Sequence, residues 1–309
     1  MVTRRVLPAL EGLTSIQRID LASRKATDPT VSAAWTHGTA FADYADALAK
    51  TTAELVYISL VNGEHERWAR AALDRGLHVI VDKPAFLGRA PAEELLELAA
   101  RKGVCLAEAT VFAYHPQIAA LKQAFVDTGA PPTRIGALFS FPAMNPENFR
   151  YRSGLGGGAL WDTGPYLTAT GRIFFGEEPT SVNCTVLARG GADNVEIAYS
   201  ASATFAGGRG LVGQFGFDTA YVNRLEILGP RLAAEADRVF TTPPDLANTL
   251  LLARQGGSST AEIPPADAFR IFFDHVVRSI EAQNWNQLGA ELLSDARTLE
   301  RYRVAAGVT

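Results

Sequence analysis

Cysteine and long apolar runs are scarce in this sequence, and their scarcity limits the classes of protein it can be. The 309 residues include two cysteines. Both Cys105 and Cys184 lie in apolar, strand-like stretches, where reduced core thiols are expected rather than a disulfide or a metal pair. No apolar stretch is long enough to span a membrane, and no signal-peptide pattern opens the sequence. We therefore expect a soluble, cytoplasmic protein with no membrane partner.

An excess of positive charge is also absent. The sequence has 29 Lys and Arg against 33 Asp and Glu, for a formal net charge of −4, so it lacks the basic surface that nucleic-acid binding requires. His37, His78 and His275 show no metal-ligand spacing, and we expect neither a nucleic-acid partner nor a metal site. The length and a hydrophobic content of 47% allow two domains with their own cores.

The most informative absence is a glycine-rich turn near the N-terminus. A dinucleotide-binding unit opens with an apolar strand, a glycine-rich turn and a helix that holds the pyrophosphate. Here residues 3–10 already predict that helix, and the first glycine, Gly12, follows it. The missing strand would be central in a sheet of order 3-2-1-4-5-6, so its neighbours would have unpaired edges. Two interpretations stay open: the true start lies upstream of this sequence, or the strand was lost naturally and neighbouring strands close the gap.

Strand and helix patterns alternate in the first third of the chain. We expect strands over residues 17–23, 53–60, 78–81 and 104–107, and helices over residues 64–75 and 91–102 that end at Gly76 and Gly103. This alternation predicts a parallel sheet with right-handed crossovers. Residues 1–114 are therefore interpreted as an α/β, Rossmann-like dinucleotide-binding domain that lacks its first strand.

The remaining residues predict a different architecture. A helix over residues 117–126 precedes strands over residues 135–141, 181–189, 195–205, 211–218 and 224–228, and residues 266–302 are helical. Consecutive strands with short turns indicate a mainly antiparallel sheet. Residues 115–309 are thus expected to form an α+β substrate and oligomerisation domain with C-terminal helices. Too few helices are available to cover both faces of the sheet, and an open apolar face predicts a homodimer or homotetramer.

The first chemical motif is Val-Asp-Lys-Pro at residues 81–84. It ends a predicted parallel strand, and ligands of such sheets bind outside the carboxyl ends of the strands. Lys83 would there reach a ribose hydroxyl or help to protonate a carbonyl oxygen. Taken alone, the tetrapeptide is more typical of a solvated lysine before a proline turn.

The second motif covers residues 156–166, with the sequence Gly-Gly-Gly-Ala-Leu-Trp-Asp-Thr-Gly-Pro-Tyr. Its glycines would let the backbone approach a ligand closely, and the helix that follows places Asp162 and Tyr166 on one face, four residues apart. The phenol could donate a proton to a developing alkoxide while the carboxylate orients the lysine or the substrate. A capping aspartate and a core tyrosine explain an isolated stretch of this kind equally well.

Together, Lys83 and the glycine motif resemble the Gfo/Idh/MocA family of oxidoreductases. Two more segments are similar: residues 60–65 resemble the family's Asn-x-x-His turn beside the nicotinamide, and residues 108–116 resemble its interdomain segment. The resemblance covers nearly the whole chain in the expected order. It implies an NAD(P)-dependent oxidoreductase in which Asn62, His65, Lys83 and Pro84 contact the cofactor.

Most members have a histidine where this chain has Tyr166. That tyrosine, together with residues 4–10 and 115–117, is similar to the nucleotide-sugar 3-ketoreductases. The resemblance implies that Tyr166 donates the proton, with Lys83 and Asp162 beside it, and that the substrate is a sugar or nucleotide-sugar. Weaker candidates for contacts to sugar or phosphate, for which packing or surface roles are at least as expected, are Tyr114, His115, Asn148, Arg150 and Tyr221.

Ser23 and Arg24 follow the predicted strand whose end would meet the adenosine ribose. An acidic residue there binds the ribose of NAD, whereas serine and arginine suit the 2′-phosphate of NADP. We therefore predict NADP, with NAD as a second possibility and an idle surface arginine as the alternative. The main functional hypothesis is an NADP-dependent carbohydrate ketoreductase. The competing hypothesis is a redox-inactive sugar-binding or lyase-like homologue that has lost dinucleotide binding.

Overall fold

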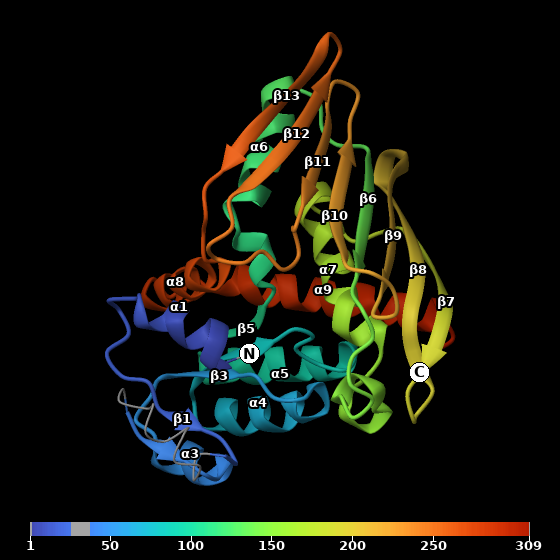
Figure 1. Cartoon of the computed structure of the whole chain (residues 1–309). Coiled ribbons are helices and arrows are strands. Elements are labelled where there is room, and N and C mark those ends of the chain that lie inside the picture. The colour runs from blue at the N-terminus through green and yellow to red at the C-terminus, as the bar shows by residue number, and fades with distance from the viewer. Residues whose placement is uncertain (1, 26–37, 309) are drawn as a thin grey trace.

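A computed structural model describes residues 2–25 and 38–308 of the chain, so His37 lies outside the described residues. The N-terminal segment is helical, as predicted: a π-helical turn, η1 (Val2–Val6), runs into α1 (Leu7–Glu11). Figure 1 shows the parallel strands in one half of the molecule and a large antiparallel sheet in the other, with α8 and α9 running between them.

The N-terminal half contains two separate parallel sheets within the described residues. In the first, β1 (Leu21–Ala22) pairs with β2 (Ala40–Phe41). In the second, β3 (Leu55–Ile58), β4 (His78–Asp82) and β5 (Leu106–Ala109) lie side by side in that order. Four of these five strands were predicted, with their parallel direction, although β1 is only two residues long; β2 was not predicted. Because β1 and β3 do not pair, the described strands do not close the gap in the sheet.

Helices cover both faces of the three-stranded sheet. On one face lie α4 (His65–Asp74) and α5 (Arg89–Lys102), which share a core with residues of β3 and β4. On the other face, Val6 and Ala9 of the N-terminal helix pack with Ile80 and with α8 (Ala268–Glu281). The preceding helix, α3 (Tyr44–Lys50), begins at a capping Asp43. The helices on both faces leave Val79, Ile80 and Val81 of β4 fully buried, and Lys83 follows the carboxyl end of that strand.

The C-terminal half is built on a mixed, mainly antiparallel sheet. Within the described residues its order is β13-β12-β11-β10-β6-β9-β8-β7, and only β6 and β9 are parallel. The strands are β6 (Arg134–Ser140), β7 (Ser181–Gly190), β8 (Val195–Phe205), β9 (Arg209–Gly216), β10 (Val222–Leu228), β11 (Ala233–Asp237), β12 (Asn248–Arg254) and β13 (Gly257–Ile263). The predicted fold class is confirmed. The last three strands were not predicted, because β11 and β13 are rich in alanine, serine and glycine, which have low β-propensity.

One face of this sheet is covered and the other is open. The covering helices are α6 (Pro116–Thr128) and α7 (Ala159–Phe175), whose apolar side chains share a core with alternate sheet residues such as Leu225 and Ile227. The opposite face exposes large apolar side chains, among them Leu138, Val212, Leu228 and Leu251. The remaining long helix, α9 (Asn286–Ala305), contacts both halves of the molecule. No helix in the described ranges has the length and apolar character needed to cross a membrane.

Candidate active site

Lys83 is held against the glycine-motif helix rather than in solvent. It follows β4, precedes Pro84 through a cis peptide bond, and its Nζ lies 3.2 Å from Asp162 Oδ1 on α7. The same ammonium donates to the backbone carbonyl oxygen of Asp162. The side chains of Lys83 and Asp162 are 14% and 8% exposed. This pair connects the two halves of the molecule at the carboxyl end of a parallel strand.

Asp162 lies between two cations. Its second oxygen, Oδ2, is 2.8 Å from Nε of Arg150, which comes from the short helix η4 (Phe149–Tyr151). The Nε–H is not aligned on that oxygen, so the contact is an ion pair without good hydrogen-bond geometry. Burial favours the neutral acid, but the charges of Lys83 and Arg150 outweigh it and lower the pKa of Asp162 to about 2. The Asp162 carboxylate is thus flanked by two cations, while Asp82, next to Lys83 in the chain, adds a second carboxylate to the charges around the lysine.

Tyr166 lies one helical turn after Asp162 and faces the same lysine. The Lys83 Nζ is 4.9 Å from the centre of its ring, and the phenyl rings of Phe112, Phe139 and Phe240 surround it with centroid distances of 5.3–5.6 Å. Burial raises the pKa of Tyr166, although the charges of Lys83 and Arg150 oppose it. The phenol is therefore protonated at neutral pH and can donate a proton.

The lysine itself stays charged. Burial favours its neutral form, but the charge of Asp162 opposes this most strongly, and the pKa of Lys83 is raised. An ammonium ion beside a protonated phenol is the arrangement that a proton-donating pair needs, because the cation stabilises the phenolate left behind.

The glycines before α7 accommodate the protein's own groups rather than a ligand. A Cβ on Gly158, whose φ is +112°, would lie 2.3 Å from Oε1 of Glu196, and a Cβ on Gly157 would lie 2.6 Å from the carbonyl oxygen of Arg152. Glu196 is buried on β8, and its carboxylate accepts a hydrogen bond from the backbone N–H of Leu160 in the first turn of α7. The expectation that these glycines admit a ligand is thus corrected: they admit a capping carboxylate from the sheet.

Glu196 is in turn paired with a cation from the C-terminal helix. Arg303 Nη1 lies 3.5 Å from Glu196 Oε1, and the Arg303 guanidinium stacks 3.9 Å from the centre of the Trp161 ring. Both side chains of this ion pair are buried. The N-terminal turn of α7, which positions Asp162 and Tyr166, is therefore fixed by β8 and α9.

Asn62 and His65 hold backbone segments around Lys83. Asn62, in the short helix η2 (Asn62–Glu64), donates through Nδ2 to the carbonyl oxygen of Gly156 at 2.8 Å. The fully buried ring of His65 has Nδ1 2.9 Å from the Pro84 carbonyl oxygen and Nε2 3.1 Å from that of Leu60. Both side chains thus position the backbone around Lys83, and direct contact with a cofactor remains a prediction.

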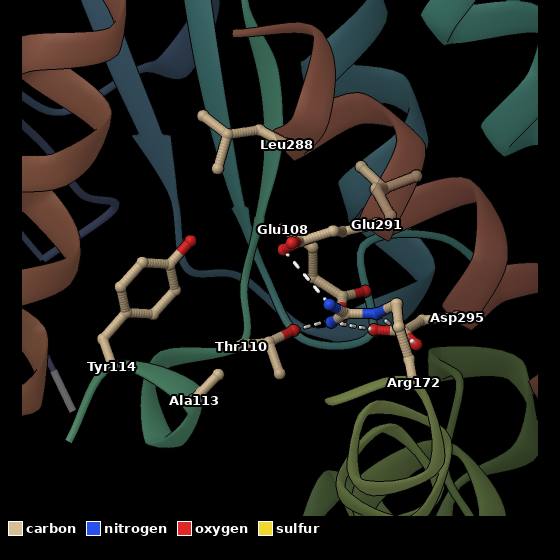
Figure 2. A pocket seen from close by; sticks show the side chains of 9 residues that line it. Glu108, Thr110, Ala113, Tyr114, Arg172, Leu288, Glu291 and Asp295 are labelled. Carbon is tan, nitrogen blue, oxygen red and sulfur yellow. Dashed lines mark hydrogen bonds and ion pairs between the residues drawn. The ribbon is translucent and has the colours of Figure 1, made fainter. Parts of the chain in front are cut away.

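Glu108, which the sequence analysis missed, supports the lysine turn from β5. One carboxylate oxygen accepts the backbone N–H of Ala85 at 2.7 Å and the other accepts the Thr110 hydroxyl at 2.7 Å. Figure 2 shows Glu108 beside Arg172, whose Nε and Nη2 bond Asp295 at 3.1 and 2.8 Å. Burial and the charge of Asp295 raise the pKa of Glu108 to about 7. The sequence did offer a sign of this role, because Glu108 is the one charged residue of the otherwise apolar strand β5.

These side chains line a small enclosed space. The cavity has a volume of about 10 Å³, enough for one water molecule. Tyr114 also lines it (Figure 2). Its ring packs against Phe272 and His275 of α8 at centroid distances of 5.1 and 5.2 Å. The structure therefore gives Tyr114 a packing position between the two halves, away from the Lys83 cluster.

Other predicted site residues hold turns and helix ends of the backbone. His115 is buried and caps α6, with Nδ1 accepting the backbone N–H of Gln117 at 3.3 Å, and Asn148 caps η4 through the N–H of Arg150 at 3.1 Å. Ser23 accepts the backbone N–H of Lys25 at 3.2 Å in the turn after β1. Arg150 is the predicted substrate residue that the structure brings directly to Lys83, Asp162 and Tyr166.

Comparison with known proteins identifies the family. The profile of an oxidoreductase family with an NAD-binding Rossmann fold, named Gfo/Idh/MocA, matches residues 6–110, and the profile of the family's C-terminal domain matches residues 131–235. A dTDP-3,4-didehydro-2,6-dideoxy-alpha-D-glucose 3-reductase from Streptomyces violaceoruber is 31% identical over 85% of this chain and 78% of its own length. The chain belongs to the Gfo/Idh/MocA family.

Two further relatives of this family member bear on its substrate. The crystal structure of a 3-ketoreductase from Actinomadura kijaniata in complex with NADP and TDP-benzene superposes with a TM-score of 0.92 at 26% identity, covering 99% of this chain and 94% of the other. A D-xylose 1-dehydrogenase (NADP(+)) from Haloferax volcanii is 28% identical over 79% of this chain and 74% of its own length. The relatives therefore include enzymes named for nucleotide-linked and for free sugars.

The family implies a dinucleotide cofactor, and the side chains at the strand ends fit one. Arg24 is exposed after β1, no residue in the described ranges pairs with its guanidinium, and the donors of a guanidinium suit a phosphate. Ser23 lies beside it, and Lys83 and Pro84 lie at the carboxyl end of β4. These residues suit the 2′-phosphate and nicotinamide ends of NADP.

Proposed function

We propose that this chain is an NADP-dependent oxidoreductase that reduces a carbonyl group of a nucleotide-linked sugar or related carbohydrate. The observation that carries the proposal is the position of Lys83, whose Nζ lies 4.9 Å from the centre of the Tyr166 ring and 3.2 Å from Asp162 Oδ1. An ammonium ion and a protonated phenol at the carboxyl end of a parallel strand are suited to protonating a carbonyl oxygen. The two relatives named as 3-reductase and 3-ketoreductase support the same chemistry.

The residues of this chain supply the proton and the electrostatic environment. Bound NADPH supplies the hydride for the carbonyl carbon. Tyr166 donates its phenolic proton to the carbonyl oxygen as negative charge develops there, and Lys83 stabilises the phenolate that remains. Asp162 fixes the lysine, and Arg150 places a second cation beside Asp162.

Cofactor selection rests on the turn after β1. In this proposal Ser23 and Arg24 bind the 2′-phosphate. Lys83 and Pro84 contact the nicotinamide. Asn62 and His65 position the backbone on either side of Lys83. Arg24→Ala is then expected to weaken NADPH binding by roughly 1.5–3 kcal/mol, the range for a hydrogen bond to a charged group. NADH binding should change little.

The test is a pair of fluorescence titrations with NADPH and NADH, together with an assay of NADPH oxidation on a panel of nucleotide-linked and free ketosugars. Arg67→Ala, which removes an exposed arginine of α4, is the matched control and should leave both affinities unchanged. Equal losses for NADPH and NADH would contradict the assignment of Arg24. A chain that binds neither cofactor would favour the redox-inactive alternative, which the comparisons do not favour.

We also propose how the chain is divided and assembled. The division into residues 1–114 and 115–309 is supported by the change from parallel to mainly antiparallel strands and by the two profiles, which match on either side of it. A homodimer or homotetramer is supported by the open sheet face, which exposes Leu138, Val212, Leu228 and Leu251.

A further inference from the structure

An arginine near the proposed active site is held in an unusual conformation without a partner for its charge. Arg238 follows β11 with a φ of +55°, a left-handed conformation that is uncommon for residues other than glycine. Its backbone N–H is bonded to the carbonyl oxygen of Asn223 at 2.7 Å, and its own carbonyl accepts the Thr242 hydroxyl at 2.5 Å. The strained backbone is therefore fixed from both sides.

The guanidinium of Arg238 is stacked on an exposed aromatic ring. Its Cζ lies 4.3 Å from the centre of the Tyr221 ring. The hydroxyl of Tyr221 is within 3.2 Å of the Thr241 hydroxyl and accepts from the amide of the buried Asn223 at 3.1 Å. Stacking leaves the edge of the guanidinium, which carries its N–H donors, free to bind a group in the plane.

No carboxylate in the described part of the chain neutralises this arginine. The adjacent Asp237 is paired with Arg224 instead, at 3.1 Å. Arg238 is exposed, and none of the ion pairs of the described residues includes it. A planar, pre-oriented and unpaired guanidinium is the group that recognises phosphate through two parallel hydrogen bonds.

The position of this pair relates it to the proposed chemistry. The ring of Phe139 contacts Tyr166 on one side and Tyr221 on the other, with centroid distances of 5.3 and 6.4 Å. One aromatic ring thus separates the proton donor from the Tyr221–Arg238 pair. A sugar that presents its carbonyl to Tyr166 would direct the substituent at its anomeric carbon away from that residue.

We propose that Arg238, stacked on Tyr221, binds the diphosphate of a nucleotide-linked substrate and so selects nucleotide-sugars over free sugars. This inference rests on the proposed function, because it assigns the diphosphate end of the same substrate. A diphosphate site would favour nucleotide-linked sugars, as in the names of the reductase relatives, over free sugars, as in the name of the D-xylose dehydrogenase. Arg238 is a specificity-determining residue in this account and takes no part in proton transfer.

The experiment is calorimetric titration of the protein, with NADP present, by thymidine 5′-diphosphate, thymidine and inorganic phosphate. Arg238→Ala is expected to weaken binding of the diphosphate by about 10- to 100-fold, the effect of losing a charge-assisted hydrogen-bonded contact. Arg238→Lys should retain part of the affinity, and thymidine binding should not change. Arg254→Ala, which removes an exposed arginine from the far end of β12, is the control and should bind the diphosphate normally.

Arg238→Gly provides a second variant that separates binding from folding. Glycine adopts a φ of +55° without strain, so this variant should melt no lower than the wild type while losing the diphosphate. Wild-type affinity in either Arg238→Ala or Arg238→Gly would overturn the proposal, as would a native protein that does not bind the diphosphate at millimolar concentration. Because the readout is binding, a failure of reductase activity would count against the proposed function and leave this inference standing.

Discussion

At the scale of single residues, the proposed proton transfer depends on the contact between Lys83 and Tyr166. The Tyr166 hydroxyl makes no hydrogen bond within the described ranges, so Tyr166→Phe removes an oxygen that the fold does not use. We expect its melting temperature to stay within a degree or two of the wild type, while turnover falls by about two to four orders of magnitude, the share of general acid catalysis.

The partner lysine should behave as part of the same unit. Lys83→Met is expected to cost a similar factor, and the double variant should lose much less than the product of the two single effects. Steady-state kinetics on the preferred ketosugar and thermal melts measure both quantities. Tyr44→Phe, which alters a tyrosine packed on Trp68 in the N-terminal half, is the control. A lower melting temperature with wild-type turnover would identify Tyr166 as a structural tyrosine.

Asp162 makes the stability of the protein sensitive to acid. Its pKa is about 2 in the folded protein, against an ordinary value of 3.8, so the unfolded chain binds more protons between these values. The stabilisation is complete above about pH 4 and is lost as the pH falls through the folded-state pKa near 2. Denaturant unfolding at a series of pH values should show the difference between wild type and Asp162→Asn shrinking from pH 5 to pH 2. A difference that is constant over this range would mean that the ion pairs with Lys83 and Arg150 do not shift the titration.

At the scale of elements, α7 depends on glycine where it begins. Gly158→Ala would place a methyl group against Glu196 and force alanine into a φ of +112°. We expect a loss of about 1–3 kcal/mol in the free energy of unfolding, measured by urea titration. Gly154→Ala is the matched control, because nothing lies within 4 Å of its added Cβ and its φ is ordinary. Equal stability of the two variants would show that the Glu196 contact adapts without cost.

The elements also show how far the sequence could predict this site. The spacing of Asp162 and Tyr166 predicted one shared helical face, and both residues do meet Lys83, because helical periodicity is a local property. Their supports were not predictable in this way. Glu196 and Glu108 reach the site from strands distant in the sequence, and only the tertiary fold brings them to the first turn of α7 and to Ala85.

The strands, too, were predictable where their own sequence determines them and unpredictable where the tertiary fold does. Val195, Ile197 and Tyr199 occupy alternate positions in the first half of β8, and its predicted bounds, residues 195–205, agree with the structure. The strands β11 and β13 owe their conformation to the neighbours they pair with, and their alanine- and serine-rich sequences carry no alternation of their own. Turn chemistry was more reliable: α5 ends at Gly103 with a φ of +68°, as its sequence predicted.

At the scale of the whole molecule, the open face of the sheet predicts self-association. Val212 and Leu251 are 58% and 44% exposed on this face, and large apolar side chains gathered on one open face favour a subunit interface. Light scattering should give the mass of a dimer or tetramer at micromolar concentration, and Val212→Glu should reduce it. Val304→Glu, which alters an exposed valine of α9, should not. A monomer in the unmodified protein would contradict the proposed assembly.

The contact between Gly158 and Glu196 also constrains how this sequence can diverge. Any side chain at position 158 would collide with the Glu196 carboxylate, and removal of that carboxylate would leave the buried Arg303 without its partner. The order of substitutions is therefore restricted, since a side chain at position 158 needs a smaller residue at position 196, a neutral partner in place of Arg303 and a backbone that has left the φ of +112°. Among descendants of a common ancestor, we expect these three positions to change together or not at all, although they are far apart in the sequence.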